Sequence, residues 1–144
     1  MKESEFWRQV KVGLEAQGAH LSRIENTAGS GIPDVNACRG GVEVWIELKI
    51  FHGRRLYFRN SQRSWIFRRD AAGGQIFVLA RKDERLFLYC GIDCVRVSSS
   101  SMVGDKSFSV LDVDLPNPIY SCMKPFKWPQ IRDAIFGTTS ITET

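Results

Sequence analysis

The segment at residues 42–51, VEVWIELKIF, most constrains the fold because it is long and apolar yet carries charge in its middle. Its β-branched and aromatic side chains are typical of a strand. Alternate residues of a strand share one face, so Glu47 and Lys49 point to one side, while Ile46 and Leu48 point to the other. The segment therefore predicts a central strand with an apolar core face and a carboxylate beside an ammonium on the opposite face.

A second strand is expected just before it, at residues 33–38, with Arg39-Gly40-Gly41 as the hairpin turn. Asp34 and Glu47 lie at similar distances from this turn, so pairing of the two strands would bring them side by side. Two such carboxylates form an oxygen site suited to Mg²⁺. Lys49 could then orient or deprotonate an attacking water and offset charge on a phosphate. Spacing alone also allows an ordinary surface ion pair of Glu47 with Lys49, with Asp34 as a turn residue.

The other periodic segments predict an α/β fold in the order helix, three strands, helix, strand, strand. The first three strands are expected to form an antiparallel meander. Beyond residue 94 the pattern weakens to one possible edge strand and a terminal helix. The expected elements are helices at residues 3–17, 60–72 and 128–136, and strands at 20–26, 33–38, 42–51, 75–80, 86–89 and 108–113.

The length of 144 residues suits one domain. We expect a core that carries the sequence motifs at about residues 3–90 and an extension at 95–144. The extension could supply a dimer surface, cover a sheet edge, or contact DNA through three cations. We expect two of its aromatic residues to pack in the core or an interface rather than to stack on bases. The residues concerned are Lys124, Lys127 and Arg132, and Phe126 and Trp128.

An acid also falls on the apolar face of the first helix. At 100° per residue, Glu3 aligns with Phe6, Trp7 and Val10, whereas Glu5 lies away from them. Glu3 either sits at the helix start, where the dipole favours an acid, or points into a site.

Positive charge is concentrated between residues 49 and 69. The chain has a net charge of +4, and this segment contributes +7 without any acid, so the remainder sums to −3. Arginine forks match phosphate oxygens, so the segment predicts contact with a polyanion, although a solvated helix face is the plainer alternative. Its cations are Lys49, Arg54, Arg55, Arg59, Arg63, Arg68 and Arg69.

Several other classes of protein fit poorly. The four cysteines are too few and too irregular for a disulfide scaffold or a zinc site, and we expect reduced thiols. No run approaches the roughly 18 apolar residues of a membrane helix. The acidic N-terminus does not resemble a signal peptide, so we expect a cytoplasmic protein. His20 and His52 have no partners for a ββα-metal site, and we interpret His52 as a turn residue.

Four short blocks in order carry a family resemblance. They are GIPD at 31–34, IELK at 46–49, NSQRSW at 60–65 and the glycine pair at 73–74. They resemble the PD-(D/E)XK nuclease superfamily, and within it the VRR-NUC type of small phage-encoded nuclease, similar to Holliday junction resolvases. The resemblance implies a restriction-endonuclease-like αβββαβ core, with a central mixed sheet flanked by helices.

The resemblance also implies roles for individual residues. Asp34 and Glu47 would be the metal-binding acids, the backbone carbonyl of Leu48 a third ligand, Lys49 the catalytic lysine, and Gln62 a glutamine turned toward the active site. A solvated helix position is the alternative for Gln62. Further candidates are Glu3 as a first-helix acid, Ser30 and Asn26 near phosphate or the metal's waters, and Arg54, Arg55, Arg59 and Arg63 on DNA.

The expected function is a Mg²⁺- or Mn²⁺-dependent DNA endonuclease, selective for structure and similar to Holliday junction resolvases. The family resemblance also implies two active sites that face two strands of branched DNA, and hence a homodimer. If phage-encoded, it would act in the host cytoplasm. The alternatives are a flap, nicking or replication-repair nuclease of the same fold, or a catalytically silent DNA-binding module. The intact acids argue against the silent module, because their repulsion destabilises a site that holds no metal.

Overall fold

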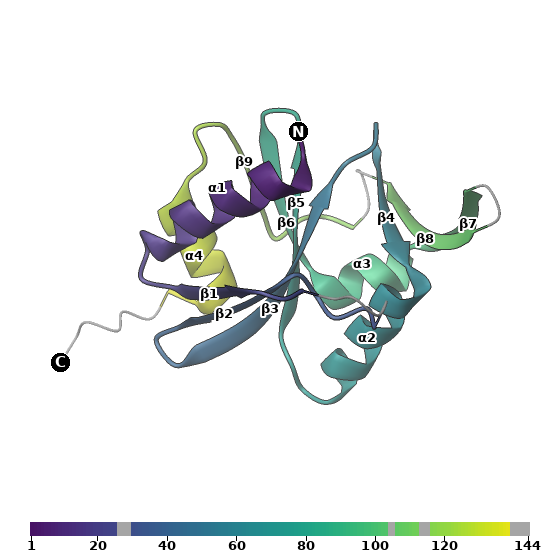
Figure 1. The fold of residues 1–144 in the computed structure, drawn as a ribbon, viewed down its shortest axis with the longest axis horizontal. Coiled ribbons are helices and arrows are strands. Elements are labelled where there is room, and N and C mark those ends of the chain that lie inside the picture. The colour runs from purple at the N-terminus through teal and green to yellow at the C-terminus, as the bar shows by residue number, and fades with distance from the viewer. Residues whose placement is uncertain (26–29, 104–105, 113–115, 139–144) are drawn as a thin grey trace.

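A six-stranded mixed sheet lies at the centre of the structure (Figure 1). The structure is a computed structural model that describes residues 1–25, 30–103, 106–112 and 116–138, with only the backbone described at 99–103 and 106–111. The strand order of the sheet is β1-β2-β3-β5-β6-β9. The β3–β5 pair is parallel and the other neighbours are antiparallel. The bounds are β1 (His20–Arg23), β2 (Val35–Arg39), β3 (Val42–Ile50), β5 (Ile76–Lys82), β6 (Arg85–Cys90) and β9 (Tyr120–Met123).

The β2–β3 hairpin has the predicted register. Arg39 pairs with Val42 across Gly40 and Gly41, whose φ angles of 58° and 81° suit glycine. At the other end of the ladder Val35 pairs with Ile46. The next step along each strand places residue 34 beside residue 47, as the sequence predicted.

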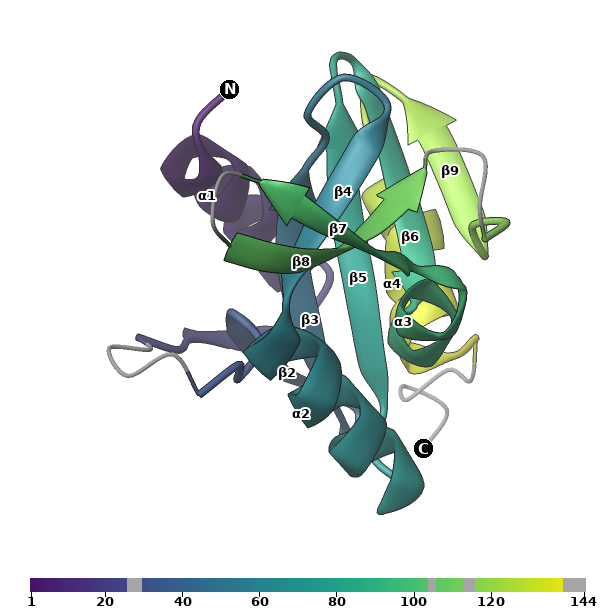
Figure 2. The ribbon, with the colours of Figure 1, turned by 90° about the vertical axis from the view of Figure 1, so that its right-hand side faces the viewer.

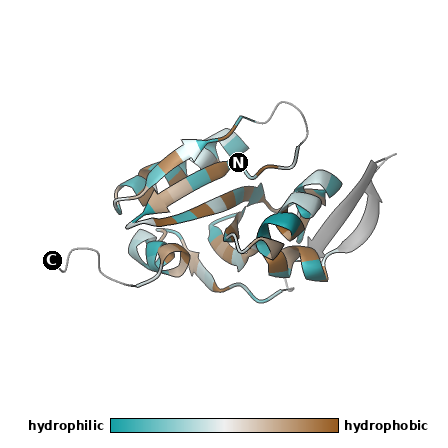
Figure 3. Ribbon diagram, turned by 90° about the horizontal axis from the view of Figure 1, so that it is seen from below, coloured by the Kyte–Doolittle hydropathy of each residue, from teal (hydrophilic) through white to brown (hydrophobic). Residues whose placement is uncertain are grey.

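Helices cover both faces of this sheet, which confirms the predicted α/β class. On one face α1 (Glu3–Glu15) and α4 (Trp128–Phe136) enclose a core that includes Ile46 and Leu48. On the other face α2 (Asn60–Ala71) and α3 (Gly91–Val97) pack with Trp45 and Ile76. Figure 1 shows the two helix pairs on either side of the strands, and in Figure 3 hydrophobic residues colour much of the central strands.

A small second sheet was not predicted. It has the order β4-β8-β7, formed by β4 (Arg55–Arg59), β7 (Ser99–Val103) and β8 (Lys106–Asp112), and lies across the α2 side of the central sheet (Figure 2). In β4, Leu56 and Phe58 are fully buried between exposed arginines. The run of cations hid this alternation, and the partner of β4 lies about fifty residues later in the chain. The predicted edge strand at 108–113 coincides with β8 over residues 108–112, and residue 113 lies outside the described residues.

The C-terminal extension completes the central layers. β9, which was not predicted, pairs with β6 and covers that edge of the sheet, one of the three roles considered for this segment. The predicted helix at 128–136 is α4, with its proline in the first turn. Trp128 lies so close to Gly13 of α1 that a Cβ there would overlap the indole ring. Phe126 is buried in the same core, as expected.

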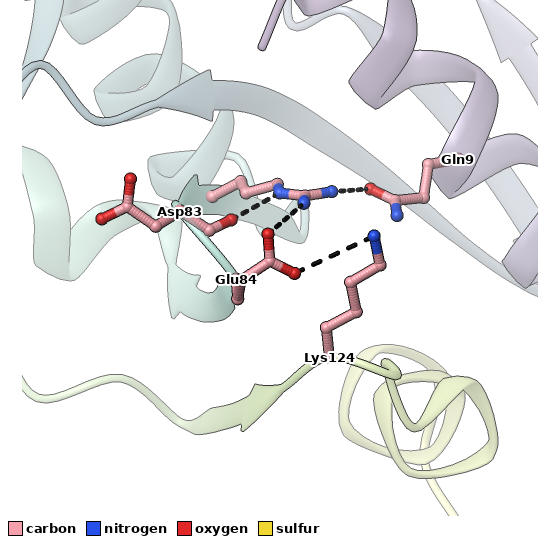
Figure 4. A network of polar contacts seen from close by, with 5 residues as sticks. Gln9, Asp83, Glu84 and Lys124 are labelled. Carbon is pink, nitrogen blue, oxygen red and sulfur yellow. Dashed lines mark hydrogen bonds and ion pairs between the residues drawn. The ribbon is translucent and has the colours of Figure 1, made fainter.

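Buried Arg81 ties this extension to the rest of the fold (Figure 4). Its Nε donates to the Asp83 carbonyl at 2.8 Å, and its Nη1 donates to Oε1 of Gln9 in α1 at 2.5 Å. Glu84 contacts both Arg81 and Lys124, each at 3.9 Å. Lys124 therefore has an intramolecular partner, which weakens the expectation that it contacts DNA.

Two expectations about composition can also be compared with the structure. The four cysteines are free thiols, as expected. None of the helices in the described ranges is long and apolar enough to span a membrane.

Candidate active site

Asp34 is held against β3 by a backbone contact. Its Oδ2 accepts a hydrogen bond from the Leu48 amide at 2.9 Å. The loop before Asp34 packs on the start of α2. In this loop Gly31 has a φ of 79°, and a Cβ on Gly31 would overlap the carbonyl of Ser61 in α2. Only glycine tolerates this approach. The GIPD block thus serves to seat Asp34 between β3 and α2.

Glu47 lies at the centre of the site and is 1% exposed. Gln62, in the first turn of α2 and also buried, donates from Nε2 to Glu47 Oε2 at 2.9 Å. The same amide accepts from Lys49 Nζ at 3.0 Å and from the Arg59 backbone amide at 2.9 Å through its Oε1. Gln62 therefore joins the carboxylate of β3 to the ammonium two residues away and caps α2, so the solvated alternative for it is wrong.

Burial and the neighbouring Asp34 favour the protonated form of Glu47. The pKa of Glu47 is raised well above its usual value, first by burial, then by a hydrogen bond with the Asp34 carboxyl group, while the charge of Lys49 opposes the rise. Two neighbouring carboxyl groups repel each other when both are ionised, and a proton held by one of them relieves the repulsion. A divalent cation can take the place of that proton, and carboxylate oxygens are the ligands that Mg²⁺ prefers. The residues present therefore fit a hard metal ion.

Glu3 reaches the edge of this site. It is the first residue of α1 and lines a cavity of about 300 Å³ together with Lys49, His52 and Tyr57. Its charge contributes to the raised pKa of Glu47. Glu5 does not line this cavity. Within the described ranges, no three His, Cys, Asp or Glu residues lie close enough together to hold a metal ion. Glu3 is therefore too far from Asp34 and Glu47 to form a three-residue metal site with them.

A second cavity, of about 500 Å³, opens beside Asp34. Asp34, Gln62 and Arg59 line it, together with Trp7 and Arg23, which sequence reasoning did not single out. The guanidinium of Arg23 lies 5.5 Å from the Trp7 ring centre. The sequence did hold a signal for Arg23. This residue ends β1, and β1 leads into the loop before Asp34, so Arg23 was a candidate for the site.

The predicted arginine surface is divided between two elements. Arg55 is exposed on β4, whereas Arg63 on α2 lies over the Phe67 ring at 4.7 Å. Arg54 forms an ion pair with Asp112 at 3.7 Å. Arginines of the segment thus extend from β4 onto α2 and do not form a single helix face.

Ser30 is exposed at the start of the loop that leads to Asp34. Asn26 lies outside the described residues.

Comparison with known proteins decides the family. A family described as archaeal Holliday junction resolvase (hjc) matches residues 1–109. The chain belongs to this resolvase family. It is therefore a member of the PD-(D/E)XK superfamily and a metal-dependent, structure-selective endodeoxyribonuclease.

A solved relative has the same fold. The chain is similar to the Hjc Holliday junction resolvase of the archaeal hyperthermophile Archaeoglobus fulgidus, with 21% identity, a TM-score of 0.53, and coverage of 76% of this chain and 82% of that one. This likeness supports the predicted restriction-endonuclease-like fold. No curated protein matches the chain.

Proposed function

We propose that this protein resolves four-way DNA junctions with Mg²⁺ or Mn²⁺ held by Asp34, Glu47 and the backbone carbonyl of Leu48. The observation that carries the proposal is the pairing of two carboxyl groups on a buried strand surface, beside Lys49 and Gln62. When bound, the metal would supply a water of lowered pKa and would offset charge on the phosphate.

The chain's own residues would position the reactants. Gln62 holds Glu47 by one end of its amide and Lys49 by the other, so the carboxylate and the ammonium keep a constant separation. Lys49 Nζ, 4.9 Å from the centre of the Phe58 ring, can turn toward an attacking water or a phosphate oxygen. The cations of β4 and α2, with Ser30, would contact neighbouring phosphates.

We also propose that the chain acts as one nuclease domain in a homodimer. Each chain carries one pair of acids, whereas resolution of a junction needs cuts in two strands. A two-fold axis would present two sites to the two strands. Analytical ultracentrifugation of the protein with and without a junction tests this point, and a monomer in both conditions would contradict it.

The finer likeness to phage-encoded VRR-NUC enzymes stays a prediction.

The decisive experiment compares DNA shapes. A four-way junction, a flap, a nicked duplex and a plain duplex are each incubated with the protein in Mg²⁺, Mn²⁺ or EDTA. We expect paired symmetrical cuts in the junction, and none in EDTA. Preferred cutting of the flap or the nicked duplex would instead favour a repair nuclease of the same fold. Absence of metal-dependent cleavage of every substrate would exclude the proposal and favour a silent DNA-binding module.

A further inference from the structure

We infer that the cavity beside Asp34 and Gln62 binds the phosphate next to the one that is cut, with the guanidinium groups of Arg23 and Arg59 as its ligands. The inference rests on the proposed function, because the scissile phosphate is placed at the two acids. It assigns a role to Arg23 and Trp7, which neither the sequence motifs nor the arginine-rich segment includes.

The position of the cavity is the first argument. The linings of the two cavities meet at a common boundary, with Lys49 in the first lining and Asp34 in the second. Glu3 lines the first and its neighbour Ser4 lines the second, while Lys49 and Gln62, which are hydrogen-bonded, also divide between them. A DNA strand that crosses this boundary would place successive nucleotides in the two cavities.

The chemistry of Arg23 is the second argument. Its guanidinium lies over the half-buried ring of Trp7, an arrangement that fixes the plane of the group and leaves its N–H edge for an anion. Among the residues that the structure describes, neither Arg23 nor Arg59 has an ion-pair partner. Two unpaired guanidinium groups at one cavity favour a phosphate, which each can bind bidentately.

Strand β4 connects the two cavities. Its alternation places Tyr57 and Arg59 on the same side, with Leu56 and Phe58 buried beneath. Tyr57 lines the first cavity and Arg59 the second. The outward face of β4 therefore bridges the two cavities over roughly 7 Å, the spacing of alternate residues in a strand. A backbone that follows this face passes from one cavity to the other.

One acid in the cavity opposes this binding and supplies a test of opposite sign. Glu25 lines the same cavity as Arg23 and is exposed. Its carboxylate repels a phosphate through the solvent. We therefore expect Glu25→Gln to tighten DNA binding, whereas Arg23→Ala and Arg59→Ala weaken it.

The experiment measures binding of the full chain to four-way junctions in EDTA, so that no strand is cut. Each junction carries one neutral methylphosphonate at a different linkage near the branch. We expect one linkage at which neutralisation weakens wild-type binding roughly tenfold. The Arg23→Ala variant should bind the unmodified junction roughly tenfold more weakly than the wild type does. Neutralising this linkage should then weaken the binding of the variant little further. Its slope of log affinity against log salt should be shallower by about 0.9.

The controls separate a specific contact from general charge. Arg8→Ala removes an exposed arginine of α1 that lines neither cavity, and it should leave the penalty at that linkage unchanged. Arg23→Lys should restore part of the affinity, because it keeps the charge but loses the fork. The inference is overturned if Arg23→Ala binds the junction as tightly as the wild type does. It is also overturned if neutralising each linkage weakens binding of Arg23→Ala as much as it weakens binding of the wild type. Failure of the proposed function would appear separately, as absence of cleavage in Mg²⁺ by the wild type.

Discussion

Gln62 donates to Glu47 at 2.9 Å and accepts from Lys49 at 3.0 Å, so a single amide on α2 links these two charged side chains of β3. Without this amide, the buried Glu47 would lose its hydrogen-bond donor and Lys49 its acceptor. The geometry of the site thus depends on how α2 packs over β3.

Gln62→Met tests this link with a side chain of similar volume. We expect kcat to fall on the order of 10- to 100-fold, because Lys49 and Glu47 lose their common partner, while KM for the junction changes little. Loss of the cap on the Arg59 amide should also lower the free energy of unfolding by about 1 kcal/mol. Single-turnover cleavage and urea unfolding measure the two effects. The exposed Gln75→Met is the matched control, and unaltered cleavage by Gln62→Met would contradict the assigned role.

Lys49→Ala should abolish cleavage and leave DNA binding close to wild type. The reason is that Lys49 is one of many cations near the path of the DNA, whereas its ammonium group is held by Gln62 beside the acids. Cleavage rates and junction affinities in EDTA are compared with those of Lys11→Ala, an exposed lysine of α1. Equal loss of binding and cleavage in Lys49→Ala would mean that the lysine acts as a phosphate contact.

Glu47→Gln should change how stability depends on pH. The pKa of Glu47 is raised above 4.5 in the folded protein, so above pH 4.5 the folded state retains a proton that the unfolded chain releases. Its contribution to stability is fully present below pH 4.5 and is lost as pH rises through the folded pKa, by up to about 1.4 kcal/mol per pH unit. Glu47→Gln removes this loss.

The measurement is urea unfolding of both proteins in EDTA at pH 5 and pH 8. The variant should gain on the wild type as pH rises. Added Mg²⁺ should stabilise the wild type at pH 8 and leave the variant unchanged, because the ion binds the ionised carboxylate of the folded state. A pH dependence shared by the two proteins would argue that Glu47 is not the group responsible.

Gly31→Ala should impair the site as well as the fold. A Cβ at this position overlaps the Ser61 carbonyl, and its φ of 79° is unfavourable for alanine. The loop carrying Asp34 must shift away from α2, so we expect weaker Mg²⁺ binding and slower cleavage. Gly53→Ala provides the control, because it has a similar φ of 61° but nothing near its Cβ. Gly53→Ala should lower the free energy of unfolding by about 1 kcal/mol, and Gly31→Ala should lower it by more. Equal cleavage by the two variants would be the contrary result.

Gly13 and Trp128 should show strong coupling. Gly13→Ala places a methyl group against the indole and should destabilise the protein by about 1–3 kcal/mol. In a Trp128→Ala background the same change should be neutral or stabilising, because alanine favours a helix over glycine by about 1 kcal/mol. Thermal unfolding of the four proteins of this cycle measures the coupling. Additive effects would show that α1 and α4 do not pack as described.

Much of the fold follows from local patterns. The alternation of β3 and the glycine pair after Arg39 are properties of adjacent residues, and each predicted its element. β4 was missed because its buried residues alternate with arginines, and the charge obscured the pattern. α3 and β9 carry weak signals of their own, and their positions depend on the sheet that they cover.

The sequence by itself determined that Glu47 and Lys49 share a face and that Asp34 lies beside them, because strand alternation and hairpin register depend on residues close together in the chain. The tertiary structure decided that Gln62 joins them and that Arg23, over Trp7, borders the same site. These contacts connect β1, α1 and α2 across the sheet. They exist because packing of apolar faces fixes where each helix lies, and no local periodicity encodes that distance.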